Sequence, residues 1–421
     1  MSEIKKIKRT EFDNGLIGVA EEVPWAKKVS LVVGVKVGVV DEDDKTNGAT
    51  HFNEHMLFKS NQYCSTGEIV RKLEYGGTEV CAETDYTQIL FSIYSFPEKL
   101  AEAVEIIYQA AGNFSYDQKE FEKEKGVILT EIQQSIENLQ ERSGDLFFST
   151  LFKGTPLERE ILGTEESVEK MTKKDLVMFK RKFFVPNNMV IAASGKFDRR
   201  GLQREIKNTF ARIEPGKKIN RNLVIDLTNS YQQKFESRPG LKQVYLTIGF
   251  KVPNLTSPDS IQLRLLGYIL GGGMSFRIFS KLRQDKGIGY GLGAGYDSHE
   301  VSSSIIAFVD GFDSKRFTEV RDIILGEFRD LRTNLISEEE LQRAKNSFKS
   351  KHFDSLMDIS TRSTCILEKE FIRIPCDFRK FHQYIDEVTR EKILEAAQKY
   401  LTDQFTLTAL VPENFRIPTW V

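Results

Sequence analysis

Two of the five histidines in this 421-residue chain, His51 and His55, lie four residues apart in the segment His51-Phe52-Asn53-Glu54-His55. On a helix this spacing places both imidazoles on one face, near enough to bind a single zinc ion at about 2.0–2.1 Å. Glu54 falls on the same side, where it can take the proton of a zinc-bound water without being a ligand. The segment therefore predicts a metal centre that activates water against a polarised carbonyl group.

An internal repeat indicates which elements must position this segment. The stretch 29–37 recurs in the second half of the chain as 244–252, with five of nine residues identical and with the apolar alternation of a half-buried strand. Two later segments also recur at nearly the same spacing, and the first of them is a capping box that predicts the start of a long helix. These are 117–121 with 337–341, and 171–176 with 388–393.

The repeat divides the chain into an N-terminal domain, residues 1–213, a linker, 214–231, and a homologous C-terminal domain, 232–421. The turn dipeptide Asn14-Gly15 predicts a hairpin of antiparallel strands. We therefore expect an α+β fold of two tandem α/β domains, each an antiparallel sheet with helices packed on one face. In the first half the expected strands are 16–23, 29–39, 88–95 and 189–194, and His51 lies on a helix after the second of them.

The two halves differ where the chemistry is expected. The alternative interpretation of His51 and His55 is two helix histidines beside a solvated glutamate. When 29–37 is aligned with 244–252, however, the counterpart of His51 is Leu266, inside the largely apolar segment 261–270. In the second half this helix serves only to pack against the rest of the domain. The polar cluster of His51, Glu54 and His55 in the first half therefore indicates a chemical function that the second half lacks. The C-terminal domain is expected to lack zinc ligands.

The order His-x-x-Glu-His, inverted from the commoner zinc-protease motif, is typical of inverzincins. The surrounding segment 48–59 closely resembles the site of the pitrilysin and mitochondrial processing peptidase family of zinc metallopeptidases. The resemblance covers the whole chain, including 14–16, 161–165, 184–189 and the duplication itself. It implies a short, two-domain member of this family.

By this resemblance the third zinc ligand is a glutamate well beyond the second histidine in the chain, which is Glu131. The family also keeps an acidic residue seven positions earlier on that helix, and here this residue is Glu124. The resemblance implies that it supports catalysis by orienting the groups that surround the metal ligands. Seven residues are two helical turns, so both carboxylates share one face. An exposed charge in a solvated run is the alternative for Glu124. The resemblance implies one Zn²⁺ per chain, held by His51, His55 and Glu131.

Relatives in this family bind substrate as an added strand on an exposed sheet edge. The edge expected here comprises Val80, Cys81, Ala82, Glu83 and Thr84. The family usually has Asn-Ala-x-Thr at this place. This chain has Cys81 at the first of these positions and is slightly shorter than the family here, so the expected register of the substrate contacts is altered. Nearby acidic side chains could favour substrates with basic side chains. The simpler interpretation is that these charges keep the exposed edge strand from pairing with other chains and aggregating.

In the second half, the glycine run 271–273 leads to Arg283 and Tyr290. By the resemblance, Tyr290 donates to the tetrahedral oxyanion and Arg283 holds a substrate carbonyl; the alternative is a surface Arg and a packed Tyr. In relatives these two residues act on the zinc site of an opposite unit, within a clamshell dimer. One chain here carries both sets, which implies a homodimer, with a paralogous subunit as a second possibility.

The overall composition excludes several other classes of function. The 60 Lys and Arg balance 61 Asp and Glu, so the net charge of −1 gives no reason to expect nucleic acid or an anionic membrane as a partner. The four cysteines form no Cys-x-x-Cys pair, which favours a reducing compartment and small buried thiols. Without an apolar signal segment or long apolar run, we expect a cytoplasmic protein.

These observations predict a zinc metalloendopeptidase that hydrolyses bonds in unfolded peptides or extended segments, with Glu54 as general base on zinc-bound water. Two alternatives remain. The first is a non-catalytic scaffold subunit like the core proteins of respiratory complexes that share the fold. The second is the catalytic subunit of a heterodimeric processing peptidase, in which Arg283 and Tyr290 would be permitted but unnecessary.

Overall fold

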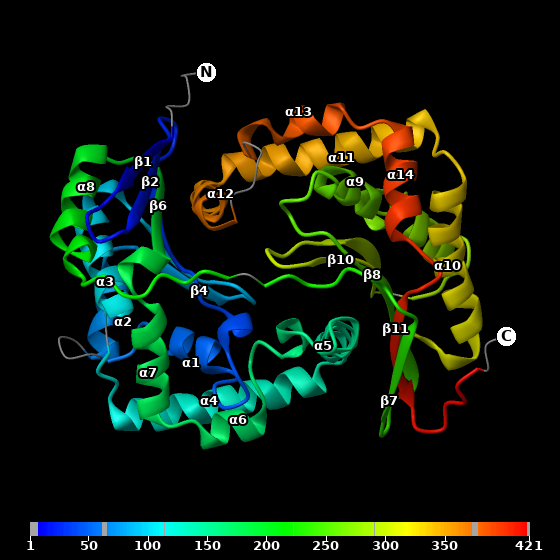
Figure 1. The fold of residues 1–421 in the computed structure, drawn as a ribbon, viewed down its shortest axis with the longest axis horizontal. Coiled ribbons are helices and arrows are strands. Elements are labelled where there is room, and N and C mark those ends of the chain that lie inside the picture. Colours follow the sequence, from blue (N-terminus) through cyan, green and yellow to red (C-terminus); the bar gives the residue numbers. More distant parts are fainter. Residues whose placement is uncertain are drawn as a thin grey trace. The chain divides into compact units, whose positions relative to one another are not determined.

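The computed structural model describes residues 7–60, 65–112, 114–221, 223–289, 291–372 and 378–418. The chain forms two compact units, and Figure 1 colours their elements along the sequence. Unit 1 comprises residues 1–133, 159–222 and 355–373, and unit 2 comprises residues 134–158, 223–354 and 374–421. No helix in the described ranges is long and apolar enough to cross a membrane.

Unit 1 is built on a six-stranded sheet in the order β1-β2-β6-β3-β5-β4. Its strands are β1 (Lys8–Glu11), β2 (Ile17–Glu22), β3 (Val29–Val35), β4 (Glu79–Thr84), β5 (Ile89–Ser95) and β6 (Met189–Gly195). Its helices are α1 (Ala49–His55), α2 (Thr66–Tyr75), α3 (Leu100–Gly112), α4 (Gln118–Glu137), α6 (Glu165–Lys170), α7 (Lys173–Phe183), α8 (Arg199–Asn208) and α12 (Ile359–Ile372). The expected hairpin is confirmed: β1 and β2 pair antiparallel on either side of Asn14-Gly15.

Unit 2 repeats this plan with a five-stranded sheet in the order β7-β11-β8-β10-β9. Its strands are β7 (Gln232–Arg238), β8 (Gln243–Val252), β9 (Gly291–Asp297), β10 (Ser303–Asp313) and β11 (Thr406–Pro412). Its helices are α5 (Leu139–Leu151), α9 (Ser260–Gly271), α10 (Phe317–Thr333), α11 (Glu338–Met357), α13 (Phe381–Asp386) and α14 (Arg390–Tyr400). The core lies between β8, β10 and β11 and the helices α9, α10 and α14.

The helix starts expected from the repeat are confirmed. The side chains of Asp117 and Ser337 accept hydrogen bonds from backbone N–H groups of the first turns of α4 and α11. Thr172 and Thr389 do the same for α7 and α14. Equivalent capping in both halves supports a duplicated fold, because each cap satisfies N–H groups that have no partner inside the helix.

The fold class of two tandem α/β domains is confirmed, but the sheets are mixed. β2 pairs parallel with β6, and β7 pairs parallel with β11, whereas the other strand pairs are antiparallel. Each late strand returns to the sheet beside an early strand after a long helical excursion. A connection of that length lets the late strand enter the sheet in either direction. The late strand can therefore lie parallel to its neighbour, which a short hairpin connection would not allow.

Helices also pack on the second face of each sheet, where one face had been expected. In unit 1, α12 contacts β6 and β3, and a Cβ at Gly34 of β3 would lie 2.7 Å from the side chains of Leu367 and Phe371. In unit 2, α5 packs on β8 and β11. Figure 1 shows α12, in orange, beside the blue and green strands of unit 1.

These two helices follow α4 and α11, so they occupy equivalent places in the repeat. Each packs in the unit formed mostly by the other half of the sequence. The compact units therefore do not coincide with the sequence halves 1–213 and 232–421, because residues 134–158 and 355–373 are exchanged between them.

Candidate metal centre

The helix α1, which carries the two histidines, begins at a sharp turn in unit 1. Gly48, its N-cap, has φ +90°, and a Cβ there would lie 2.8 Å from the carbonyl oxygen of Leu162, so a glycine is required. The buried Glu42 carboxylate accepts hydrogen bonds from the N–H groups of Gly48 (2.9 Å) and Thr50 (2.8 Å). Burial raises the Glu42 pKa to about 7, although these hydrogen bonds oppose the shift. Glu42 thus anchors the first turn of α1, and no local sequence signal identifies it.

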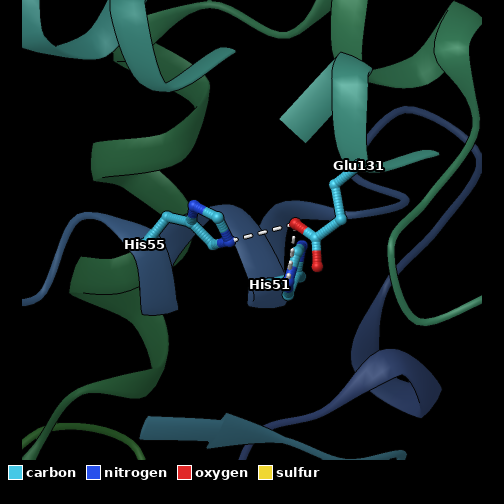
Figure 2. A group of neighbouring side chains, drawn as sticks. All are labelled: His51, His55 and Glu131. Atoms are coloured by element: carbon cyan, nitrogen blue, oxygen red, sulfur yellow. Dashed lines mark ion pairs between the residues drawn. The ribbon is translucent and has the colours of Figure 1, made fainter. Parts of the chain in front are cut away.

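The side chains of His51, His55 and Glu131 converge, as Figure 2 shows. The Glu131 Oε2 atom lies 3.3 Å from His55 Nε2 and 3.8 Å from His51 Nε2. One potential ligand atom from each residue lies within 4.8 Å of the others, and this is the one such His/Cys/Asp/Glu group among the described residues. The residue that sequence spacing alone could not select, Glu131, is brought in by α4.

The protonation of these groups fits a metal ligand set. Burial, with the neighbouring His55, lowers the His51 pKa to about 4, so its imidazole is neutral at pH 7. The hydrogen bond from His55 lowers the Glu131 pKa. For His55, burial lowers the pKa but hydrogen bonds to Glu131 and Glu124 outweigh it, and the net shift is upward. A metal ion would take the place of the proton shared by His55 and Glu131.

The donor set of two imidazoles and one carboxylate is one that zinc takes in catalytic sites, and the residues present fit this metal. Glu124 contacts one of the three potential ligands. Its carboxylate lies 3.3 Å from Nδ1 of His55 and 2.6 Å from Nζ of Lys59. Glu124 is buried, which excludes the alternative of a solvated surface charge. Lys59 was not singled out from the sequence, although it lies in the segment that carries the family resemblance.

Glu54 lies on the same helix but is not part of this ligand group. Its Oε2 atom accepts a hydrogen bond of 2.7 Å from the Thr84 hydroxyl, at the end of β4. Burial raises the Glu54 pKa, and the Thr84 hydrogen bond opposes the shift. A partly buried carboxylate with a raised pKa beside a metal ligand set has the properties of a general base.

The expected substrate strand, residues 80–84, lies in β4, an edge of the unit 1 sheet. β4 pairs with β5 on one side, with Val80 opposite Ile93 and Glu83 opposite Leu90. Cys81 is exposed, which corrects the expectation of a small buried thiol at this position. Cys64 and Cys376 lie outside the described residues.

The residues expected to hold the substrate carbonyl and oxyanion belong to the other unit. Arg283 lies in a π-helical turn, Phe279–Gln284, of unit 2, and its Nη1 atom donates to the Gly289 carbonyl at 3.0 Å. Tyr290 lies outside the described residues. Arg283 is thus a side chain of unit 2, whereas the ligand group belongs to unit 1.

The second half carries no equivalent of the metal site among its described residues. Leu266, the counterpart of His51, is fully buried in α9, and Ala344, the counterpart of Glu124, is fully buried in α11. The same helices therefore serve packing in unit 2.

Two family models match the chain. One is described as Insulinase (Peptidase family M16) and matches residues 19–165, and the other as Peptidase M16 inactive domain and matches residues 170–348. An uncharacterized zinc protease of Mycobacterium leprae is 26% identical over 96% of this chain and 91% of its own length. The uncharacterized zinc protease YmxG of Bacillus subtilis is 24% identical over 97% of this chain and 99% of its own length.

Two solved structures share the fold. A protease from Helicobacter pylori superposes with a TM-score of 0.92 at 20% identity, covering 97% of this chain and 100% of that chain. A putative M16-like peptidase from Alicyclobacillus acidocaldarius gives a TM-score of 0.82 at 19% identity, covering 97% and 98%. With both M16 family models matched in order along most of its length, the chain belongs to peptidase family M16, the pitrilysin family.

Proposed function

We propose that this protein is a zinc-dependent endopeptidase that hydrolyses bonds in unfolded peptides or extended segments. The observation that carries the proposal is the convergence of His51, His55 and Glu131 beside Glu54, at the end of an exposed sheet edge. A second candidate, a non-catalytic scaffold subunit, has no need for this complete ligand set.

His51, His55 and Glu131 would hold one Zn²⁺ per chain. When bound, zinc polarises a carbonyl and lowers the pKa of water toward neutrality. Glu54 takes the proton from the attacking water and later passes it to the leaving amine. Its raised pKa brings it closer to the working pH, which suits both steps.

The exposed edge of β4 would bind the substrate as an added antiparallel or parallel strand. Main-chain hydrogen bonds to β4 would give affinity with little demand on sequence, which suits extended peptides. Thr84 ends this strand and also donates to Glu54, so a bound strand would lie next to the general base.

The test is to measure zinc content and the cleavage of a quenched fluorescent peptide for the pure wild-type protein and for Glu54→Gln. We expect one zinc per chain in both proteins, with cleavage reduced about 10²–10⁴-fold in the variant. Chelator should abolish wild-type cleavage. A wild-type protein that binds no zinc would refute the proposal, and zinc binding with cleavage only after adding a paralogous polypeptide would favour a heterodimeric processing peptidase.

A further inference from the structure

Unit 2 contains a cavity of about 520 Å³ between α5 and one face of its sheet. Its apolar walls include Phe147 and Phe148 of α5 and Phe308 of β10, and its polar groups include Gln140 and Asp310. This volume lies within the range of cavities that bind small molecules or peptide side chains. All of its lining residues belong to unit 2, so it is separate from the metal centre of unit 1.

The cavity exists because β9 presents glycines to this face. Residues paired across a sheet point to the same side, and Gly291 and Gly293 of β9 pair with Asp310 and Phe308 of β10. A third glycine, Gly295, would have no atom within 4 Å of an added Cβ. The glycine positions of β9 thus supply no side chains to the volume under α5, although Leu292 of the same strand is among its lining residues.

Asp310 is placed at this cavity by an irregularity in β10. The pairing of β10 with β8 shifts register between Val309 and Phe312, and Gly311, at φ +69°, lies within this bulge. Bulges re-aim side chains and are frequent beside functional sites. The side chain of Gln140, on α5, hydrogen-bonds the Asp310 carboxylate, and burial raises the Asp310 pKa to about 6.

Among the described residues of unit 2, Gln140 is a hydrogen-bond partner of the Asp310 carboxylate and no cationic side chain pairs with it. At pH 7 this carboxylate is largely ionised, and a partly buried carboxylate without a counter-ion is unfavourable. Phe148 and Phe308 offer aromatic surface near it, and aromatic faces attract cations as well as apolar groups. The missing element of this cavity is therefore a positive charge next to apolar surface.

We propose that this cavity is a second peptide-binding site, which takes a lysine or arginine side chain together with an adjacent large apolar side chain. The cation would pair with Asp310, and the apolar side chain would pack against Phe147, Phe148 and Phe308. The peptide as ligand rests on the proposed function, whereas the selection of a basic and apolar pair rests on the cavity itself.

The test uses the full chain with Glu54→Gln, so that bound peptide is not cleaved. Fluorescence anisotropy measures binding of labelled, terminally blocked Gly/Ser peptides with one Phe-Lys, Phe-Glu or Ala-Lys pair. Asp310→Asn removes the charge and keeps the shape. Gly144→Leu fills the cavity, because Gly144 lines it and an added Cβ meets nothing within 4 Å. Gly326→Leu, at an equally open helical glycine in α10, is the matched control.

We expect the Phe-Lys peptide to bind about tenfold more tightly than the other two. Asp310→Asn should remove the preference for Lys over Glu, Gly144→Leu should weaken Phe-Lys binding about tenfold, and Gly326→Leu should leave it unchanged. Equal binding of the three peptides, or unchanged binding in Asp310→Asn and Gly144→Leu, would overturn the assignment.

Hydrolysis is measured separately on a peptide that lacks both Phe and Lys, with Glu54 intact. Cleavage of that peptide with no selective binding would refute the cavity assignment and leave the proposed function standing. Selective binding that depends on Asp310 without any cleavage would refute the proposed function and support the cavity assignment.

Discussion

Glu124 contacts one ligand of the candidate metal centre from behind. Its carboxylate lies 3.3 Å from Nδ1 of His55, and Lys59 holds its other oxygen at 2.6 Å. A histidine whose Nδ1–H is held by a carboxylate presents Nε2 to a metal in one tautomer and one orientation. We therefore propose that Glu124 positions the Nε2 atom of His55.

We expect Glu124→Gln to weaken zinc binding about 10–100-fold. The amide keeps the size of the side chain but loses the charge that holds both His55 and Lys59. Competition with a fluorescent zinc chelator measures the affinity. Glu122→Gln, at an exposed glutamate of the same helix, is the control and should bind zinc as the wild type does. Equal zinc affinity in the two variants would contradict the positioning role.

At the scale of the element, α1 depends on a carboxylate outside the helix. Glu42 accepts hydrogen bonds from two N–H groups of the first turn, which have no partner within the helix. Its pKa is raised from 4.5 to about 7 by burial, so the folded protein binds more protons at Glu42 than the unfolded chain between these pH values. The contribution of Glu42 to stability is present at low pH and decreases as pH rises through this window.

We expect the wild type to be more stable than Glu42→Gln, with a difference that shrinks by up to about 3 kcal/mol between pH 4.5 and 7. The glutamine amide has no titration in this range, so it removes that part of the pH dependence. Urea unfolding of both proteins across the window gives the two free energies. A difference that stays constant or grows with pH would contradict the raised pKa of Glu42.

The exchanged helix α12 is attached to the unit 1 sheet by a buried ion pair. Arg362 donates to the Glu21 carboxylate of β2 through Nη2 at 2.6 Å and Nε at 2.8 Å, and both side chains are almost fully buried. Ser194 of β6 also donates to this carboxylate. Removing one partner of such a pair leaves an unpaired charge in the interior.

We expect Arg362→Met to lower the free energy of unfolding by about 3–5 kcal/mol, since Glu21 would be left buried without its hydrogen-bonded partner. The double variant Arg362→Met with Glu21→Gln should recover part of this loss. Denaturant unfolding of the two single variants and the double variant forms the cycle. Additive effects of the two substitutions would show that the pair is not coupled.

At the scale of the whole molecule, the ligand group belongs to unit 1 and Arg283 to unit 2. The family resemblance implies that Arg283 and Tyr290 act at the zinc site of a second copy of the chain. The near-zero net charge gives no long-range attraction toward a substrate, so selection would rest on short-range contacts and on access to the site.

We expect Glu54→Gln and Arg283→Ala to be inactive alone and to regain activity when mixed under conditions that exchange subunits. A mixed dimer would have one complete site, so an equal mixture should reach about a quarter of wild-type activity. Peptide cleavage and light scattering on the same samples measure activity and assembly. An active monomer, or mixed dimers without activity, would contradict the homodimer.

Most of the candidate metal centre could be predicted from the sequence, because several of its residues lie together in one short segment. The spacing of His51, Glu54 and His55 determines that they share one face of a helix, whatever surrounds it. Glu131 lies on a different helix, far along the chain from His55, and was reached only through the family resemblance, while Glu42 and Lys59 were missed. Their roles depend on contacts between separate elements, and no periodicity in the chain records such contacts.

The repeat, the helix starts at Asp117 and Ser337, and the difference between the two copies can all be read from the order of residues along the chain. The packing positions of α5 and α12, in contrast, become known from the folded chain. Each helix has one buried face, and the residue pattern of that face does not record which sheet it covers. Their placement depends on close fits such as Gly34 against Leu367, which exist only after the sheets have formed. The same holds for the cavity beside Asp310, because its walls come from α5 and from strands of the other half of the sequence.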